Sequence, residues 1–157
     1  MESGGFDHVE FFRALEASGA RVLLIGRQAL IALGLPVNTK DYDLWIHVDD
    51  AAAVNQATAP LGLVANYTPE LARTRGRYVL ENSERVDVLV ARSVSTVDGV
   101  MVFFDDVWSR RERVEIAPGV SVALPCLDDL IVTKRFGARG RDADDIQMLE
   151  VLRSRRT

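Results

Sequence analysis

The N-terminal part of the chain has apolar residues at helical spacing. Residues 7–18 place their large apolar side chains on one helical face: Phe11, Phe12 and Leu15. Asp7 stands where a helix N-cap is expected, with Glu10 three residues later. Gly19 then ends the pattern, so the spacing predicts a helix over 7–18.

The next segments alternate between strand and helix signals. The unbroken apolar run 21–25 is typical of a strand that is buried on both faces. Gly26 follows directly, and the pattern then predicts a short helix over 28–33. A second strand is expected over 41–48, and a further helix from 49 to about 61.

The middle of the chain predicts a strand hairpin, 74–80 with 84–91, joined by a turn at 81–83. The interpretation of 104–111 stays open, with a short helix as one choice. The last expected elements are a second hairpin and two closing helices: 114–116 with 120–122, then 128–136 and 142–152. This order predicts an α+β fold, with a mixed β-sheet, helices packed on one face and closing C-terminal helices.

Length and composition change this picture little. The 157 residues fit one domain, 1–157, and 48% hydrophobic with 27% charged residues is an ordinary globular balance. No apolar stretch approaches the roughly 20 residues of a membrane helix. The start of the chain lacks the basic and apolar pattern of a secretory signal, and Cys126 is the single cysteine. We therefore expect a cytoplasmic protein without disulfides or a zinc scaffold, and no membrane partner.

The charge pattern gives a mixed indication about partners. A formal net charge of −4 argues against a general nucleic-acid binder. Of the 19 basic residues, only Lys40 and Lys134 are lysine. Genomic base composition explains that bias, and so does phosphate binding by guanidinium groups. Arg73, Arg75 and Arg77 alternate on a predicted strand, as a solvated face or as a contact for a nucleic-acid acceptor.

Three aspartates form the candidate catalytic group. Side chains alternate along a strand, so Asp41 and Asp43 point to one face while their apolar neighbours point to the other. Asp87 interrupts a valine-rich strand and is costly to bury without a partner. If the two strands are neighbours, the carboxylates meet on one face and provide the oxygen ligands that Mg²⁺ prefers. Three carboxylates can hold two metal ions for a phosphoryl-type displacement.

Gly26 is the candidate phosphate-binding position. A glycine between a strand and a helix lets the backbone approach a phosphate closely. The following helix start offers free N–H groups to an anion. The sequence therefore predicts a phosphate site beside the metal carboxylates.

These residues together resemble the nucleotidyltransferase superfamily that includes DNA polymerase β. Its pattern is an apolar strand, a glycine followed by a small residue, an Asp-x-Asp pair and a third acid on a later strand. Gly26, Asp41, Asp43 and Asp87 occur in that order. The closing segments 130–134 and 141–146 are similar to the tail of small bacterial nucleotidyltransferase-like proteins, among them abortive-infection toxins.

The resemblance implies a nucleotidyltransferase-like fold and Mg²⁺-dependent transfer of a nucleoside monophosphate from an NTP such as ATP, with two ions. It implies that Asp41, Asp43 and Asp87 bind metal, that Gly26 holds phosphates and that Lys134 and Arg141 contact the nucleotide. Asp142 and Asp145 would orient Lys134 or the neighbouring arginine. RNA, protein or a small molecule stay open as acceptors, and a cognate antitoxin is an implied partner of a toxin.

Arg27 departs from the family pattern, because it follows Gly26 where the family has a small residue. Its guanidinium could grip a phosphate of the nucleotide, or it could fill the space and exclude the nucleotide. The second interpretation predicts a catalytically inactive binding or regulatory module with the same fold. A third hypothesis is a metal-dependent nuclease, because acidic clusters serve that chemistry too.

Overall fold

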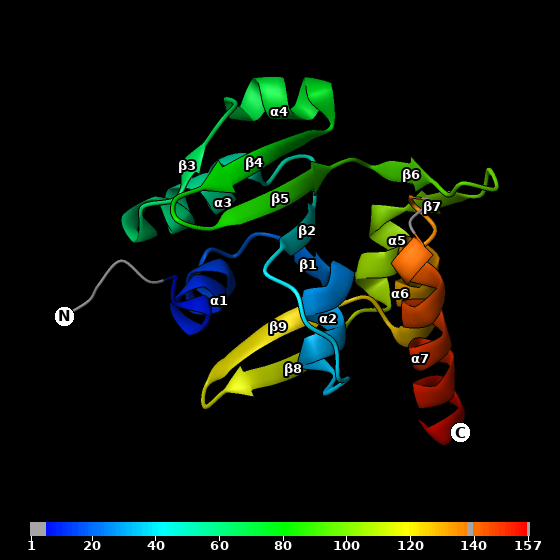
Figure 1. Ribbon diagram of the computed structural model, residues 1–157. Helices are drawn as coiled ribbons and strands as arrows, with labels where there is room; N and C mark the ends of the chain where they lie inside the picture. Colours follow the sequence, from blue (N-terminus) through cyan, green and yellow to red (C-terminus); the bar gives the residue numbers. More distant parts are fainter. Residues whose placement is uncertain (1–5, 138–139, 157) are drawn as a thin grey trace.

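The computed structural model describes residues 6–137 and 140–156, and no side-chain description extends to Gly140 and Arg141. Figure 1 shows strands in the centre with helices around them. The helices are α1 (His8–Ala17), α2 (Gly26–Ala32), α3 (Ala51–Thr58), the 3₁₀ turn η1 (Ala59–Leu61), α4 (Pro69–Arg75), α5 (Phe104–Ser109), α6 (Leu127–Thr133) and α7 (Gly140–Arg156). The strands are β1 (Val22–Ile25), β2 (Tyr42–Ile46), β3 (Val64–Ala65), β4 (Arg77–Glu81), β5 (Arg85–Val90), β6 (Ser93–Ser95), β7 (Met101–Phe103), β8 (Glu112–Ala117) and β9 (Val120–Leu124).

The central sheet has five strands in the order β1-β2-β5-β4-β3. Strands β2 and β5 are parallel, and the other neighbouring pairs are antiparallel. The chain between β2 and β5 includes α3, α4, β3 and β4, which gives the long connection that a parallel pair needs. The predicted α+β fold with a mixed sheet is therefore confirmed.

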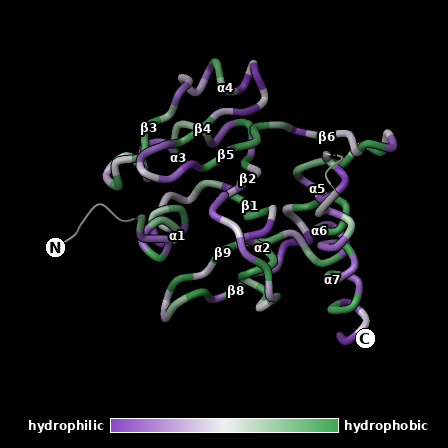
Figure 2. The backbone as a smooth tube through the Cα atoms, in the orientation of Figure 1, coloured by the Kyte–Doolittle hydropathy of each residue, from purple (hydrophilic) through white to green (hydrophobic). Residues whose placement is uncertain are grey.

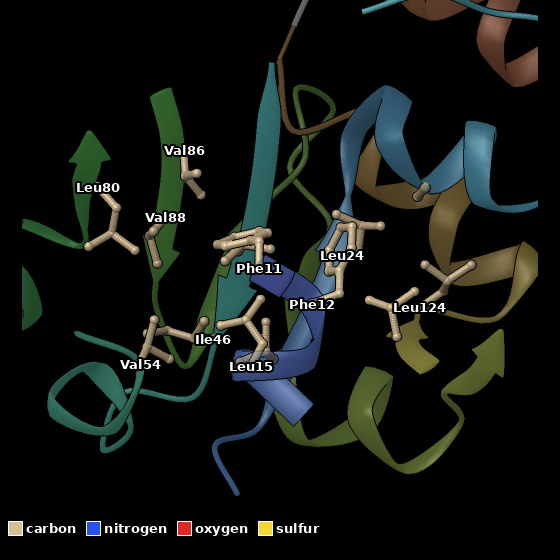
Figure 3. Close-up of a cluster of buried hydrophobic side chains, with 14 of the residues drawn as sticks. Phe11, Phe12, Leu15, Leu24, Ile46, Val54, Leu80, Val86, Val88 and Leu124 are labelled. Carbon is tan, nitrogen blue, oxygen red and sulfur yellow. The ribbon is translucent and has the colours of Figure 1, made fainter. Parts of the chain in front are cut away.

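One face of the sheet carries the larger hydrophobic core. Leu44 and Ile46 of β2 and the three valines of β5 are at most 1% exposed and belong to this core. Helices α1, α2 and α3 contribute apolar side chains to it, and Figure 3 shows Phe11, Phe12 and Leu15 of α1 beside Leu24 and Ile46. The Asp7 side chain caps α1 by accepting from the N–H groups of Val9 and Glu10, as predicted.

The opposite face has a smaller core, centred on Trp45. The indole lies edge-on to Phe104 of α5 at 5.3 Å between ring centroids, and its N–H donates to the Ala91 carbonyl. Helix α5 thus adds cover on the face opposite the main helix layer. The reason is that Leu23 and Trp45 give β1 and β2 apolar side chains on this face too.

Residues 69–75 form helix α4, so the prediction that a strand begins at residue 74 is wrong. The Thr68 side chain caps α4, Pro69 occupies its first turn, and Gly76 ends it at a φ of +82°. Arg73 and Arg75 therefore lie on the helix and Arg77 on β4, so the expected row of three arginines on one strand does not form.

The short strands β3, β6 and β7 were not expected from the sequence. Each has at most three residues, which is too short for an alternation pattern. The two closing helices are present as α6 and α7, and Figure 2 shows hydrophilic positions recurring along α7. In the part of the chain that the structure describes, no helix has the length and apolar character to cross a bilayer.

Candidate functional site

Asp43 and Asp87 are direct register partners on the parallel strands β2 and β5. Their neighbours Leu44 and Val88 point into the larger core, so both carboxylates lie on the opposite face of the sheet. The condition set by the sequence, that the two strands are neighbours, is met. Asp41 lies just before β2 and is exposed, and its backbone N–H donates to the Thr39 hydroxyl at 3.0 Å.

Gly26 lies against the Asp43 carboxylate. Ile25 is the register partner of Asp43 in the β1–β2 pair, and Gly26 follows it as the first residue of α2. Gly26 has a φ of +72°, and a Cβ built on it would lie 2.6 Å from Asp43 Oδ2. Any side chain at this position would therefore collide with the carboxylate, which gives a physical reason for glycine here.

A cleft of about 590 Å³ opens on this face of the sheet. Its floor includes the carboxylates of Asp43 and Asp87. The side next to β1 is here called the lysine wall: Ile25, Gly26, Thr133, Lys134, Phe136, Gly137 and Asp142. The side formed by β4, the start of β5 and the segment after β3 is called the arginine wall: Asn66, Tyr67, Arg77, Tyr78, Val79 and Arg85.

A buried carboxylate, Asp145, supports the lysine wall from behind. Its side chain is 0% exposed and binds two cations. Arg27 donates from Nε and Nη2 to the two carboxylate oxygens at 3.2 and 3.0 Å, and Lys134 Nζ lies 2.7 Å from Oδ2. Asp142 Oδ1 is further from the same ammonium, at 3.9 Å. Burial raises the pKa of the Asp145 carboxyl, but the hydrogen bonds from Arg27 and Lys134 outweigh burial and lower it overall.

Arg27 does not line the cleft. In addition to Asp145, its Nη1 donates to the Asn38 carbonyl at 3.2 Å, so the guanidinium links α2, α7 and the loop before β2. The space in front of Gly26 is therefore not filled by this side chain. This placement differs from both interpretations of Arg27 at the sequence level, since the residue neither faces the phosphate position nor blocks it.

The structure brings together most of the predicted site residues. Gly26, Asp43, Asp87, Lys134 and Asp142 all line the cleft. Asp145 lies behind it, with the contact to Lys134 that an orienting role requires. The side chain of Arg141 lies outside the described residues, so its predicted nucleotide contact stays a prediction.

The donor set suits Mg²⁺ only in part. Among the described residues, no group of three or more His, Cys, Asp or Glu side chains is arranged to hold a metal ion. Asp87 Oδ1 lies 3.2 Å from Arg85 Nε. Asp43 and Asp87 nevertheless provide two carboxylates on one face, and Mg²⁺ is usually bound by one or two carboxylates together with substrate phosphates. The residues present therefore fit Mg²⁺ that enters with a triphosphate better than a prebuilt ion cage.

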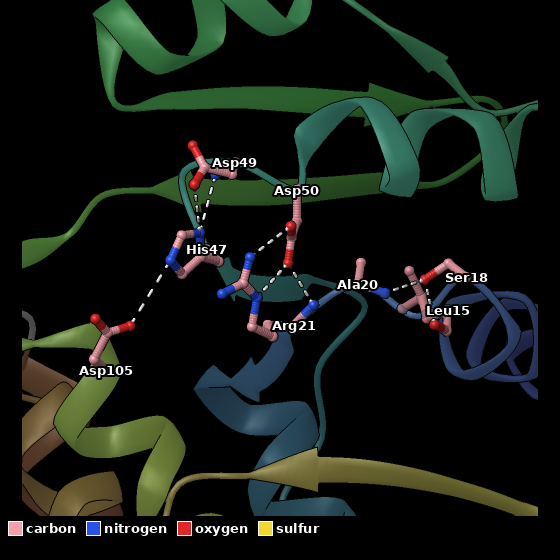
Figure 4. A network of polar contacts seen from close by, with 8 residues as sticks. All are labelled: Leu15, Ser18, Ala20, Arg21, His47, Asp49, Asp50 and Asp105. Atoms are coloured by element: carbon pink, nitrogen blue, oxygen red, sulfur yellow. Dashed lines mark hydrogen bonds and ion pairs between the residues drawn. The ribbon is translucent and has the colours of Figure 1, made fainter.

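A second polar network, around Arg21 and Asp50, lies at the other end of β1 and β2 (Figure 4). The Arg21 guanidinium donates to both oxygens of Asp50 at 2.9 and 3.0 Å, and its backbone N–H donates at 2.7 Å. His47 accepts from the Asp49 N–H at 3.1 Å. None of these residues lines the cleft, so the network joins the start of β1 to the start of α3.

Two parts of the site were missed at the sequence level. Arg85 lies two residues before Asp87, so strand alternation alone could have placed it on the same face. Arg77 could be placed only from the β4–β5 register, and the Arg27–Asp145 pair joins positions 118 residues apart. No local pattern in the sequence signals that pair.

Solved structures with the same fold carry nucleotidyltransferase names. TM1012 of Thermotoga maritima, a proposed nucleotidyltransferase, aligns at a TM-score of 0.57 and 14% identity, covering 92% of this chain and 87% of its own. The antibiotic-resistance factor ANT(2'')-Ia aligns at 0.60 and 12%, covering 92% and 86%. The lincosamide antibiotic adenylyltransferase LnuA, solved with lincomycin, aligns at 0.61 and 13%, covering 94% and 98%.

These alignments show that the chain has the nucleotidyltransferase fold, as the sequence resemblance predicted. The similarity is in structure rather than in sequence. No protein-family model matches the chain, and no curated protein matches it.

Proposed function

We propose that this protein transfers a nucleoside monophosphate from an NTP to an acceptor hydroxyl and releases pyrophosphate. The observation that supports this most directly is the Asp43–Asp87 register pair, which lies beside the Gly26 turn in the cleft that Lys134 also lines. In the reaction, the acceptor oxygen forms a bond to the α-phosphorus, the bond to the pyrophosphate oxygen breaks, and the hydroxyl proton is lost.

The residues divide the work as follows. Asp43 and Asp87, with Asp41 at the cleft entrance, would hold Mg²⁺ with the triphosphate. Bound Mg²⁺ would supply the positive charge that balances the transferring phosphates. Lys134 would donate to a phosphate oxygen from the lysine wall, while Gly26 keeps the space beside Asp43 open. Asp87 would also face the acceptor hydroxyl, because it lies on the side of Asp43 towards the arginine wall.

The position of Arg27 favours an active enzyme over an inactive module. The inactive reading depended on this side chain filling the phosphate position. Its guanidinium instead binds Asp145 behind the lysine wall. The substitution of the small family residue therefore leaves the cleft accessible.

The finer parts of the proposal rest on less. ATP as the nucleotide and a cytoplasmic toxin that an antitoxin neutralises are proposed from the resemblance of the chain to abortive-infection proteins. The antibiotic-modifying neighbours make a small-molecule acceptor an equal starting point.

Calorimetric titration of the four NTPs, with and without Mg²⁺, tests the proposal. We expect binding of at least one NTP that requires Mg²⁺, is abolished by EDTA and is lost in Asp41→Asn/Asp43→Asn. Asp49→Asn is the matched control, because Asp49 is an exposed aspartate near the far end of β2 and does not line the cleft. Circular dichroism should show both variants folded.

The result has two clear contrary outcomes. If no NTP binds the wild-type protein, the catalytic proposal is wrong and the inactive module is supported. If NTP binding persists in the double variant, the triphosphate is held elsewhere and the site assignment is wrong. Once an acceptor is found, Asp43→Asn alone should abolish transfer.

A further inference from the structure

The charged side chains of the arginine wall are all cationic. Arg77 and Arg85 are its ionisable groups of fixed charge, and no Asp or Glu is among its residues. The acids that line the cleft, Asp43, Asp87 and Asp142, lie on the floor or the lysine wall. This local charge contrasts with the net charge of −4 for the whole chain.

The sheet register places the two arginines on either side of Asp87. Arg85 is two residues before Asp87 on β5 and contacts it at 3.2 Å. On β4, Val79 is the partner of Asp87, and Arg77 lies two residues before Val79 on the same face. A group bound at Asp87 would therefore have one guanidinium on each side.

Arg77 is available for a ligand. It is exposed, and within the described parts of the chain no carboxylate forms an ion pair with it. Arg85 has Asp87 as its ion-pair partner, and its side chain is 61% exposed. Glu81 is the register partner of Arg85 but does not line the cleft.

A third arginine lies next to the wall. The Arg75 guanidinium lies over the Tyr67 ring at 5.7 Å from its centroid, and Tyr67 lines the cleft. The cationic character therefore continues from β5 across β4 to the last turn of α4. An aromatic ring beside guanidinium groups is a surface that accepts phosphate and a flat ring together.

We propose that the second substrate carries a phosphate group next to its reacting hydroxyl, and that Arg77 and Arg85 bind that phosphate. This inference rests on the proposed transferase function, because it assigns the triphosphate to the lysine wall and the acceptor to the arginine wall. A planar guanidinium can bind a phosphate through two parallel hydrogen bonds, and two of them disfavour a cationic acceptor. A nucleic-acid strand and a small phosphorylated metabolite share this chemistry.

The experiment measures binding of three probes to the full chain with Mg²⁺. The probes are a 5′-phosphorylated single-stranded RNA of about ten nucleotides, ribose 5-phosphate, and ribose as the uncharged control. Fluorescence anisotropy follows the RNA, and ligand-observed NMR follows the sugars. Arg77→Ala and Arg77→Ala/Arg85→Ala are compared with Arg73→Ala, whose side chain pairs with Asp49 outside the cleft.

We expect at least one phosphorylated probe to bind the wild type and to lose roughly tenfold or more in affinity in Arg77→Ala. Arg73→Ala should stay within about twofold, since a solvated surface charge contributes little. Binding of RNA but not ribose 5-phosphate identifies a strand as the source of the phosphate, and the reverse identifies a small acceptor. The proposal is overturned if neither phosphorylated probe binds better than ribose, or if Arg77→Ala and Arg73→Ala behave alike.

A parallel titration with Mg-ATP separates this proposal from the transferase function. Binding of Mg-ATP that Arg77→Ala leaves intact, with no phosphorylated probe bound, overturns the acceptor assignment and leaves the function standing. If Mg-ATP and the other NTPs fail to bind while a probe is lost in Arg77→Ala, the anion site stands and the transferase function is wrong.

Discussion

The two walls of the cleft use cations in opposite ways. Lys134 on the lysine wall has a side chain that is 7% exposed and is held by the fully buried Asp145. Arg77 on the arginine wall is exposed and has no carboxylate partner among the described residues. A charge fixed in advance suits a group that every substrate shares, such as a triphosphate. An unpaired charge on an open wall suits the substrate that differs from one enzyme to the next.

Removing the buried carboxylate should give the largest effect and would break the contrast between the walls. Asp145→Asn leaves Arg27 and Lys134 without their anion, and we expect a loss of about 3–5 kcal/mol in the free energy of unfolding. Guanidinium chloride denaturation measures it. Asp142→Asn is the control, because that carboxylate is 3.9 Å from Lys134 and should cost much less. A loss below about 1 kcal/mol would show that Asp145 does not hold the wall.

The glycine at the lysine wall offers a matched pair of variants. Gly26→Ala and Gly34→Ala both force alanine to a positive φ, which costs about 1–2 kcal/mol each. Only at Gly26 does the added Cβ meet Asp43, since nothing lies within 4 Å of a Cβ at Gly34. We expect Gly26→Ala to be the more destabilising and to weaken NTP binding in calorimetry. Equal effects of the two variants would mean that the close approach to Asp43 is unimportant.

Acid should weaken the lysine wall before other parts of the fold. The folded pKa of Asp145 lies below the value of 3.8 for an unperturbed carboxyl. Its contribution to stability is therefore present above that value and is lost as the pH falls through the lower folded pKa. Urea unfolding at neutral pH and in acid should show a smaller pH dependence for Asp145→Asn than for the wild type. Asp50, whose pKa Arg21 also lowers against the effect of burial, contributes separately and is removed in Asp50→Asn. An unchanged pH dependence in Asp145→Asn would contradict this assignment.

The smallest effect on stability is expected at the arginine wall. Arg77→Ala should change the free energy of unfolding by no more than about 0.5 kcal/mol, as for other exposed positions without partners. Chemical denaturation of the same samples used for probe binding provides the measurement. A loss comparable to that of Asp145→Asn would show that Arg77 is structural and would remove the contrast between the walls.

The sequence predicted the parts of the site that depend on local order. Strand alternation placed Asp43 and Asp87 on one face, and the glycine after the first strand marked the turn. It could not place Arg27, because the position of that side chain depends on Asp145, 118 residues later. The strand expected at 74 failed for a local reason, since the Thr68 cap, Pro69 and Gly76 together favour a helix over 69–75.

The Arg27–Asp145 ion pair also has a consequence during synthesis. Ribosomes add about 5–20 residues per second, so roughly 6–24 s separate the two partners as the chain emerges. Until α7 docks, Arg27 lies beside an unfinished cleft and Lys134 lacks its anchor. The nascent chain can therefore form the central sheet and its carboxylate pair well before it can grip a triphosphate, which delays any activity until the closing helix has been made.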